Sequence, residues 1–296
     1  MERQDFISCS PLRVRRSWLR WPTRGQGRCG QAGFKLRAQG HDAGLVAAVL
    51  TQAKLRRRAA AKFGPFAERM IFTDAGLEQA SRLSVAGLHA NRFRQAGIGE
   101  VADLGCGIGA ESMALASLDI NVKAFEIDEV TAAVATYNLS PFENAFVEQA
   151  DVTALDLSKF EGLFFDPARR ELGGPSRERA SRKFDPAAFS PTFDFVVEAA
   201  AKKPTGVKFG PGHPHEGIPA NAEAQWVSVD GDLVELGLWF GAVARPDVKR
   251  AALLINGNTK HEIISDSAER QDAPIGELGA YVYEPDNSVV RSHLIG

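Results

Sequence analysis

The sequence has no long uninterrupted apolar run, and this lack excludes several classes of protein. Its apolar stretches, such as residues 44–50 (GLVAAVL), are far too short to span a bilayer. Residues 1–21 carry charged residues throughout and lack the continuous apolar segment of a secretory signal peptide. We therefore expect no membrane association and a cytoplasmic location.

Cysteine is also scarce. The three cysteines, Cys9, Cys29 and Cys106, are scattered and form no C-x-x-C pair. This excludes a disulfide framework and fits a reducing compartment. With 44% hydrophobic and 24% charged residues, the chain can bury a core without such cross-links. A length of 296 residues allows one large α/β domain with an appendage, or two modest domains.

Net charge is low overall but unevenly distributed. The whole chain carries -2, with 35 basic and 37 acidic residues. Residues 1–63 contain 14 Lys and Arg against only Glu2, Asp5 and Asp42, a local charge of +11 that leaves -13 for the rest. A basic arm on an acidic body favours a polyanionic partner such as RNA. A solvated helix face is the open alternative for these arginines.

The first third of the chain predicts two helices after an irregular arm. Residues 1–31 show neither helical nor strand periodicity, so we expect a poorly ordered basic arm. An amphipathic helix follows the N-cap Asp42 and stops at Gly64. A second helix follows Thr73 and ends at a glycine near residue 97. Residues 32–97 thus form a predicted helical subdomain.

From residue 98, short apolar runs alternate with helical stretches, which is typical of a parallel doubly wound sheet. An Asp230-Gly231 pair then joins two further strands in a hairpin. Residues 98–247 form this predicted domain, and residues 248–296 hold two more strand-like pieces, 251–256 and 279–285. The five strands predicted before the hairpin are 100–104, 121–127, 145–149, 162–166 and 205–210.

A glycine-rich loop lies where the first predicted strand meets the first helix. Gly105, Gly107 and Gly109 allow close backbone approach to a ligand at a helix N-terminus. Glu126, at the end of the second strand, can accept both hydroxyls of a ribose. An NAD-binding protein has the same features, so these residues indicate a nucleoside without identifying it. A purely structural acid at position 126 is the alternative.

Two further acids narrow the choice of cofactor. Asp103 precedes the first glycine by two residues, where a carboxylate suits the cationic end of S-adenosylmethionine better than a pyrophosphate, which it repels. Asp151, after the third strand, can accept a hydrogen bond from an adenine amine. Cys106 is interpreted as a small packing residue.

With these motifs the chain resembles class I S-adenosylmethionine-dependent methyltransferases. The segments FTDAGLEQASR, FFDPARR, VKFGPG, WVSVDGDLVELGLWFG and YVYEPDNSVVR resemble more narrowly the bacterial, mainly actinobacterial, methyltransferases with a C-terminal THUMP-like domain. The resemblance implies an α/β Rossmann-like fold with a seven-stranded sheet in the order 3-2-1-4-5-7-6. It also implies S-adenosylmethionine as cofactor, and residues 248–296 as the start of a truncated THUMP-like segment. Residues 1–31 match nothing in the family.

The chain is more distantly similar to trimethylguanosine synthases, in which an aromatic-Ser/Thr pair caps the cofactor. Phe72 and Thr73 occupy the comparable place. The alternative is a core phenylalanine followed by an N-capping threonine.

The stretch GLFFDPARR resembles the (Asn/Asp)-Pro-Pro-aromatic motif of amino-methylating relatives. The resemblance implies that Asp166 and the carbonyl of Pro167 accept hydrogen bonds from an acceptor nitrogen. Arg169 stands at the position of the aromatic residue and could stack on a base or bind a phosphate. The alternative is a surface arginine paired with nearby acids. Residues 171–186 are glycine-rich and highly charged, which fits a mobile substrate loop as well as it fits a plain solvated loop.

The sequence thus predicts an enzyme that methylates a nitrogen of an RNA base, with rRNA or tRNA as partner and no metal. His213, His215 and Glu216 could in principle bind a metal, but they are not joined by another partner at ligand spacing. We therefore interpret them as part of a loop at the rim of a pocket. A non-catalytic cofactor-binding RNA-interaction module and, on the glycine loop alone, an NAD(P)-dependent oxidoreductase are the alternatives. The oligomeric state is not predicted.

Overall fold

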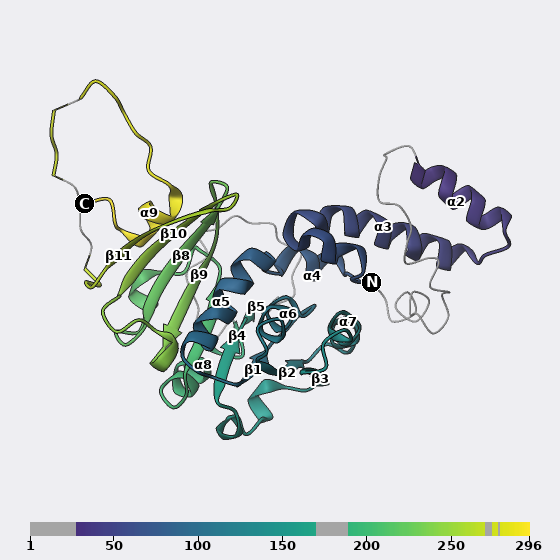
Figure 1. Cartoon of the computed structure of the whole chain (residues 1–296), viewed down its shortest axis with the longest axis horizontal. Helices are drawn as coiled ribbons and strands as arrows, with labels where there is room; N and C mark the ends of the chain where they lie inside the picture. The colour runs from purple at the N-terminus through teal and green to yellow at the C-terminus, as the bar shows by residue number, and fades with distance from the viewer. Residues whose placement is uncertain (1–27, 170–188, 270–273, 278) are drawn as a thin grey trace, which may run out of the picture. The chain divides into compact units, whose positions relative to one another are not determined.

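Nine strands form one mixed sheet in the order β11-β10-β8-β9-β7-β4-β1-β2-β3 (Figure 1). The computed structural model describes residues 28–169, 189–269, 274–277 and 279–296. A separate two-stranded ladder pairs β5 with β6. The strand bounds are Glu100–Leu104 (β1), Asn121–Glu126 (β2), Ala145–Gln149 (β3), Gly162–Phe165 (β4), Ala168–Arg169 (β5), Phe189–Ser190 (β6), Thr205–Phe209 (β7), Glu223–Val229 (β8), Asp232–Phe240 (β9), Arg250–Asn256 (β10) and Thr259–Ser265 (β11).

The five strands predicted before the hairpin are confirmed as β1, β2, β3, β4 and β7. β4 pairs in parallel with both β1 and β7, and β2 pairs in parallel with β3. In β4 every side chain is buried, and in β1 all but the first, as expected for parallel strands covered on both faces.

The predicted hairpin is also confirmed. β8 and β9 pair antiparallel, and Asp230 and Gly231 both have positive φ, 53° and 86°. This backbone suits a two-residue turn between strands with a right-handed twist. β9 also lies antiparallel to β7.

The prediction of a seven-stranded sheet is wrong in number. Strands β1, β2, β3, β4, β7, β8 and β9 have the predicted order 3-2-1-4-5-7-6, but β10 and β11 extend the sheet beyond β8. β10 pairs in parallel with β8, and Ala251 and Ala252 have no exposed surface. Burial of these apolar residues stabilises the pairing of β10 with β8.

The chain divides into two compact units. Among the described residues, the first unit holds 28–94 and 105–154, and the second holds 95–104 and 155–296 except for the undescribed gaps. The first unit therefore contains β2 and β3 with most of the helices that precede β4. The second contains β1, β4 and the remaining strands.

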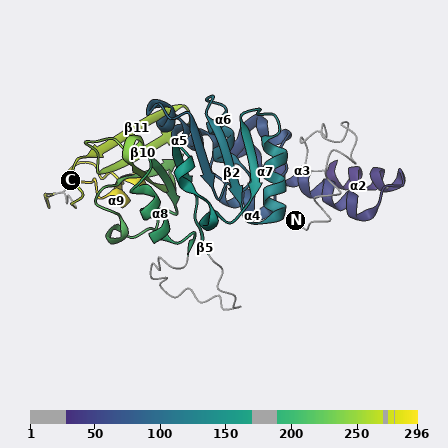
Figure 2. The ribbon, with the colours of Figure 1, turned by 90° about the horizontal axis from the view of Figure 1, so that it is seen from below.

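The helices described by the structure include none long and apolar enough to cross a membrane. In the first unit, α6 and α7 pack on β2 and β3, and Figure 2 shows α7 beside these strands. The α-helix bounds are Arg28–Ala38 (α2), Ala43–Phe63 (α3), Asp74–Gln79 (α4), Leu83–Gln95 (α5), Ala110–Ala116 (α6), Glu129–Leu139 (α7), Phe193–Ala200 (α8) and Asn287–Ser292 (α9).

The predicted helix between Asp42 and Gly64 is confirmed as α3. Asp42 caps it by accepting hydrogen bonds from the backbone N–H groups of Gly44 and Leu45, and the helix ends at Gly64 with φ 54°. α2 begins at Arg28, so residues 28–31 are helical although their sequence has no helical period. The rest of the predicted arm, residues 1–27, lies outside the described residues.

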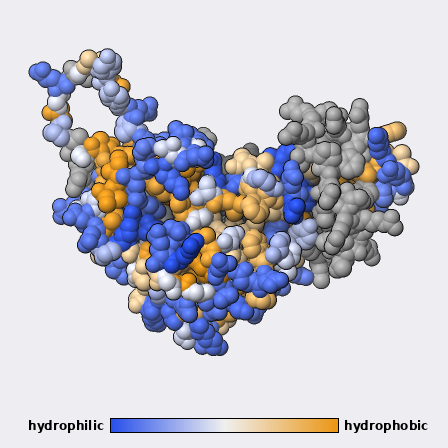
Figure 3. Space-filling model, in the orientation of Figure 1, coloured by the Kyte–Doolittle hydropathy of each residue, from blue (hydrophilic) through white to orange (hydrophobic). Residues whose placement is uncertain are grey.

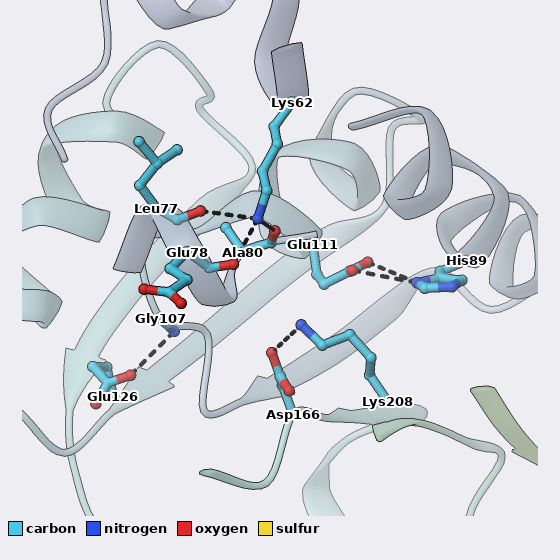
Figure 4. A network of polar contacts seen from close by, with 10 residues as sticks. All are labelled: Lys62, Leu77, Glu78, Ala80, His89, Gly107, Glu111, Glu126, Asp166 and Lys208. Atoms are coloured by element: carbon cyan, nitrogen blue, oxygen red, sulfur yellow. Dashed lines mark hydrogen bonds and ion pairs between the residues drawn. The ribbon is translucent and has the colours of Figure 1, made fainter. Parts of the chain in front are cut away.

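The single helix predicted after Thr73 is wrong, because two helices occupy that segment. α4 ends at Ala80, whose backbone is extended (φ -60°, ψ 139°). The Lys62 ammonium donates to the carbonyl oxygens of Leu77, Glu78 and Ala80 at 2.7–2.9 Å (Figure 4). The Lys62 side chain of α3 therefore donates the hydrogen bonds that the backbone N–H groups of a longer α4 would otherwise supply.

The strand-like piece predicted at 279–285 is not a strand. Tyr281, Val282 and Tyr283 are more than three quarters exposed, and no described strand pairs with them. The helix α9 follows this segment, capped by Asp286 and packed on β8 and β10. Figure 3 shows apolar side chains at the surface of this part of the second unit. Ile263, Ile264, Val290 and Ile295 are among the exposed large apolar residues of the second unit.

His215 connects the loop after β7 to the C-terminal segment. Its ring stacks on Trp226 of β8 at 4.9 Å and on His293 at 3.9 Å between centroids. Burial, followed by the positive charges of His293 and Arg250, lowers the pKa of His215 to about 4. The neutral imidazole is therefore the form that packs here at neutral pH.

This packing predicts a loss of stability in mild acid. In the unfolded chain the pKa of His215 is near its ordinary value of 6.5. The unfolded state therefore binds more protons between pH 6.5 and about 4, and protonation stabilises it relative to the folded state. After allowance for partial exposure, the free energy of unfolding should fall by about 1–2 kcal/mol over this range. Urea unfolding at pH 7 and pH 4.5 should show this extra loss in the native protein but not in His215→Phe. A control variant of the exposed His261, His261→Gln, should keep it, and an equal loss in His215→Phe would contradict the assignment.

Candidate active site

The glycine loop of the first unit has the backbone that its sequence predicted. Gly105, Gly107 and Gly109 have φ values of 91°, 55° and 89°, a region that side chains disfavour. The N–H groups of Gly105 and Cys106 both donate to the carbonyl oxygen of Phe125 at 3.0 Å, which ties the loop to β2. A Cβ atom at Gly107 would meet nothing within 4 Å. The loop is thus held at its start and open at its middle.

Glu126 joins the end of β2 to this loop. Its carboxylate accepts the N–H of Gly107 at 3.1 Å and the N–H of Asp128 at 3.0 Å (Figure 4). The side chain is only partly buried, so it keeps surface available to a ligand. A carboxylate fixed in this way can accept hydrogen bonds from a vicinal diol beside the loop.

The segment before α4 is clamped by buried amides. Gln52 of α3 exchanges two hydrogen bonds with the backbone of Phe72, at 2.7 and 3.0 Å. Asn138 of α7 does the same with Ile71, at 2.8 and 3.0 Å, and also donates to the carbonyl oxygen of Ile108 at 3.0 Å. Asn138 therefore couples this segment directly to the glycine loop.

The hydrogen bonds from Gln52 fix the backbone position of Phe72, and Thr73 follows it directly. The Phe72 side chain has no exposed surface and its ring lies 5.5 Å from that of Phe63, while the Thr73 hydroxyl accepts the N–H of Gly76 at 2.9 Å. A Cβ at Gly76 would collide with Ile108, so α4 rests directly on the glycine loop. The structure thus brings Thr73 to the loop through α4, and the capping of a cofactor by this pair stays a prediction.

Asp151 follows β3 and is exposed. Its carboxylate accepts the backbone N–H of Thr153 at 2.9 Å and its hydroxyl at 2.7 Å, which starts a short 3-10 helix, Val152–Ala154. The exposed carboxylate retains accepting capacity beyond these bonds, since it has about four lone-pair sites.

A buried His89–Glu111 pair was missed at the sequence level. His89 Nδ1 lies 3.2 Å from Glu111 Oε2, and both side chains are less than a tenth exposed (Figure 4). Glu111 stands in the first turn of α6, so the pair holds α5 to the helix that follows the glycine loop. No sequence signal could have found it, because the two residues belong to different helices whose packing was unknown.

In the second unit, Asp103 and Asp166 lie on neighbouring parallel strands. Asp103 of β1 is opposite Phe164 of β4 and has no exposed surface. Asp166 comes directly after β4, and its N–H donates to the carbonyl oxygen of Leu104 at 3.4 Å. The predicted end-of-strand position of Asp166 is thus what the structure has.

The Asp166 carboxylate forms an ion pair with Lys208 at the end of β7. Lys208 Nζ lies 2.5 Å from Asp166 Oδ2 (Figure 4). The Asp166 side chain is 33% exposed and that of Lys208 12%. Pro167, the next residue, is buried. Lys208 had no predicted role, because the sequence does not specify the register between β4 and β7 that places it opposite Asp166.

Arg169 is placed by its backbone only. It belongs to β5, where it pairs with Phe189 of β6. The predicted substrate loop, residues 171–186, lies outside the described residues. Among the side chains that the structure does describe, no group of three or more His, Cys, Asp or Glu residues is arranged to hold a metal ion.

The arrangement is that of an α/β Rossmann-like methyltransferase fold. A crystal structure from Porphyromonas gingivalis, provisionally described as a methyltransferase, matches 99% of this chain and 73% of its own, with a TM-score of 0.68 and 19% sequence identity. The likeness at this identity establishes the fold.

Sequence relatives point in the same direction. The chain is 29% identical over 253 residues to an uncharacterized S-adenosylmethionine-dependent methyltransferase of Mycobacterium tuberculosis, found in two strains. The match includes 81% of this chain and 66% of the relative, so the chain spans about two thirds of the relatives' length. Residues 30–59 match a family model described as a domain of unknown function, DUF8688.

Proposed function

We propose that this protein is an S-adenosylmethionine-dependent methyltransferase that acts on a nitrogen of an RNA base. The observation that carries the proposal is the glycine loop held open and bonded to Glu126, in a methyltransferase fold. The mycobacterial relatives, which are named as S-adenosylmethionine-dependent methyltransferases, support it.

The residues of the first unit fit the cofactor. The space beside Gly107 is open, so a ligand could approach the protein backbone there. Glu126 carries a carboxylate that would accept hydrogen bonds from the ribose hydroxyls. Asp151 would accept the adenine amine. In the second unit, Asp103 carries a negative charge that favours a cationic ligand over a pyrophosphate. When bound, S-adenosylmethionine supplies an electrophilic methyl group on its sulfonium.

Asp166 and Pro167 would orient the acceptor. A carboxylate accepts hydrogen bonds and does not donate them when ionised, so Asp166 would take the N–H of an amine or amide and turn the nitrogen lone pair away from itself. Pro167 restricts the backbone of the loop that follows β4 and adds a carbonyl acceptor. Catalysis of this kind consists mainly of positioning and exclusion of water.

RNA is proposed as the substrate class because of charge. Residues 1–63 carry +11, and Arg169 follows the proposed catalytic pair. Both features suit a polyanion with exposed bases. We further infer a cytoplasmic site of action, and a relationship to the actinobacterial methyltransferases that carry a THUMP-like domain.

A transfer assay with labelled methyl donor and total RNA from cells lacking this gene tests the proposal. We expect label in one nucleoside of rRNA or tRNA, and binding of S-adenosylhomocysteine by calorimetry. Binding without labelled RNA would favour the cofactor-binding RNA-interaction module. Binding of NAD without S-adenosylhomocysteine would instead indicate the oxidoreductase.

A further inference from the structure

The register of the sheet brings Lys208 to Asp166. In the parallel pair of β4 and β7, Phe164 lies opposite Gly206 and Phe165 opposite Val207. One residue further along both strands, the same register sets Asp166 opposite Lys208. Lateral neighbours in a parallel pair project on the same face, so the two side chains meet beyond the strand ends.

An apolar surface lies below this ion pair. The Trp239 ring lies against Gly206, where an added Cβ would approach it closely, and against Gly237, the partner of Lys208 in β9. The Trp239 side chain has no exposed surface, and the Phe164 ring lies 6.4 Å from it. Because Gly206 and Gly237 have no side chains, aromatic rings cover the sheet beside them. We therefore expect less water on this side of the ion pair.

The two side chains of the ion pair differ in their solvent exposure. Lys208 is nearly buried while Asp166 keeps a third of its surface. The ammonium lies on Oδ2, so the carboxylate can still meet a ligand through its remaining surface. A carboxylate above aromatic rings would tend to protonate without a cation, and a protonated acid becomes a donor in place of an acceptor.

We propose that Lys208 is a positioning residue that keeps the Asp166 carboxylate ionised and turned so that it accepts the N–H of the methyl acceptor. The inference rests on the proposed function for the identity of that acceptor. Its physical content, that Lys208 controls the protonation of Asp166, does not depend on any activity.

Two substitutions separate this role from a merely structural one. Lys208→Met keeps an apolar side chain of similar length and removes the charge, and Lys208→Arg restores a cation. Lys202→Met is the matched control. Lys202 forms an ion pair of 2.7 Å with Glu198 in the same unit, but both side chains are about 70% exposed.

The first measurement is a titration of the Asp166 carboxyl carbon by NMR, assigned with Asp166→Asn. In Lys208→Met we expect the midpoint to rise by at least about one pH unit, because the carboxylate then loses the ammonium that lies against it. Lys202→Met should leave the midpoint unchanged and Lys208→Arg should hold it near the native value. An unchanged midpoint in Lys208→Met overturns the inference, whether or not the protein transfers methyl groups.

The second measurement is transfer kinetics. At neutral pH, kcat of Lys208→Met should fall by about ten- to a hundredfold, because the ammonium no longer holds the carboxylate in place. It should fall further as pH drops toward the raised midpoint, with unchanged affinity for S-adenosylhomocysteine. A lowered melting temperature with native kcat would show a structural ion pair only and overturn the positioning role. If the native protein transfers no methyl group to RNA, the proposed function fails, and the titration still decides what Lys208 does.

Discussion

Replacement of Asp166 by alanine is expected to reduce methyl transfer by at least about a hundredfold, since the acceptor nitrogen then loses the group that orients it. Affinity for S-adenosylhomocysteine should stay within about twofold of native, because the proposed cofactor contacts involve other residues. Initial rates with saturating donor and calorimetry of the product nucleoside measure the two quantities.

Two further variants test whether this effect is specific to Asp166. Asp166→Asn keeps one carbonyl acceptor and should retain an intermediate rate, whereas Asp247→Ala, an exposed acid of the same unit, should change neither quantity. Removal of Asp166 also leaves the nearly buried Lys208 without its ion-pair partner, so thermal stability must be measured alongside. Unchanged transfer in Asp166→Ala would contradict the role assigned to this residue.

Replacement of Glu126 by alanine should weaken binding of S-adenosylhomocysteine by about a hundredfold. Two hydrogen bonds to a carboxylate contribute about 3 kcal/mol together, which corresponds to this change in Kd. The variant also frees the N–H of Gly107, which Glu126 holds at 3.1 Å, so the loop loses one of its restraints.

Glu148→Ala on β3 is the matched control, because Glu148 is an exposed acid on the strand that pairs with β2. It should leave the Kd within about twofold of native. Circular dichroism should show both variants folded, since Glu126 is only partly buried. Native affinity in Glu126→Ala would assign this acid a structural role at the strand end.

Much of the fold was predictable because its signals are local. The turn at Asp230-Gly231 and the loop at Gly105, Gly107 and Gly109 require positive φ, which these residues adopt at low cost. Asp42 likewise marks the start of α3 through its own side-chain oxygen. Such features depend on a few neighbouring residues, so the sequence is sufficient to predict them.

Contacts between distant segments account for the errors. The break between α4 and α5 depends on Lys62, which reaches the carbonyl oxygens of Leu77 and Ala80 from another helix. β11 was not predicted, although it pairs with β10 along its whole length. Its side chains are mostly exposed, so it carries no strong apolar pattern.

The sequence by itself therefore determined the glycine loop and the acids at the strand ends, whereas the order of β1 to β4 and β7 to β9 was implied by the resemblance to class I methyltransferases. Only the tertiary structure decided that Glu126 bonds to Gly107, that Asn138 couples residue 71 to residue 108, and that Asp166 meets Lys208. For Asp166 and Lys208 the physical reason is register, since a strand's partner and offset decide which side chains become neighbours. For Glu126 and Asn138 it is the packing of segments that are far apart in the sequence.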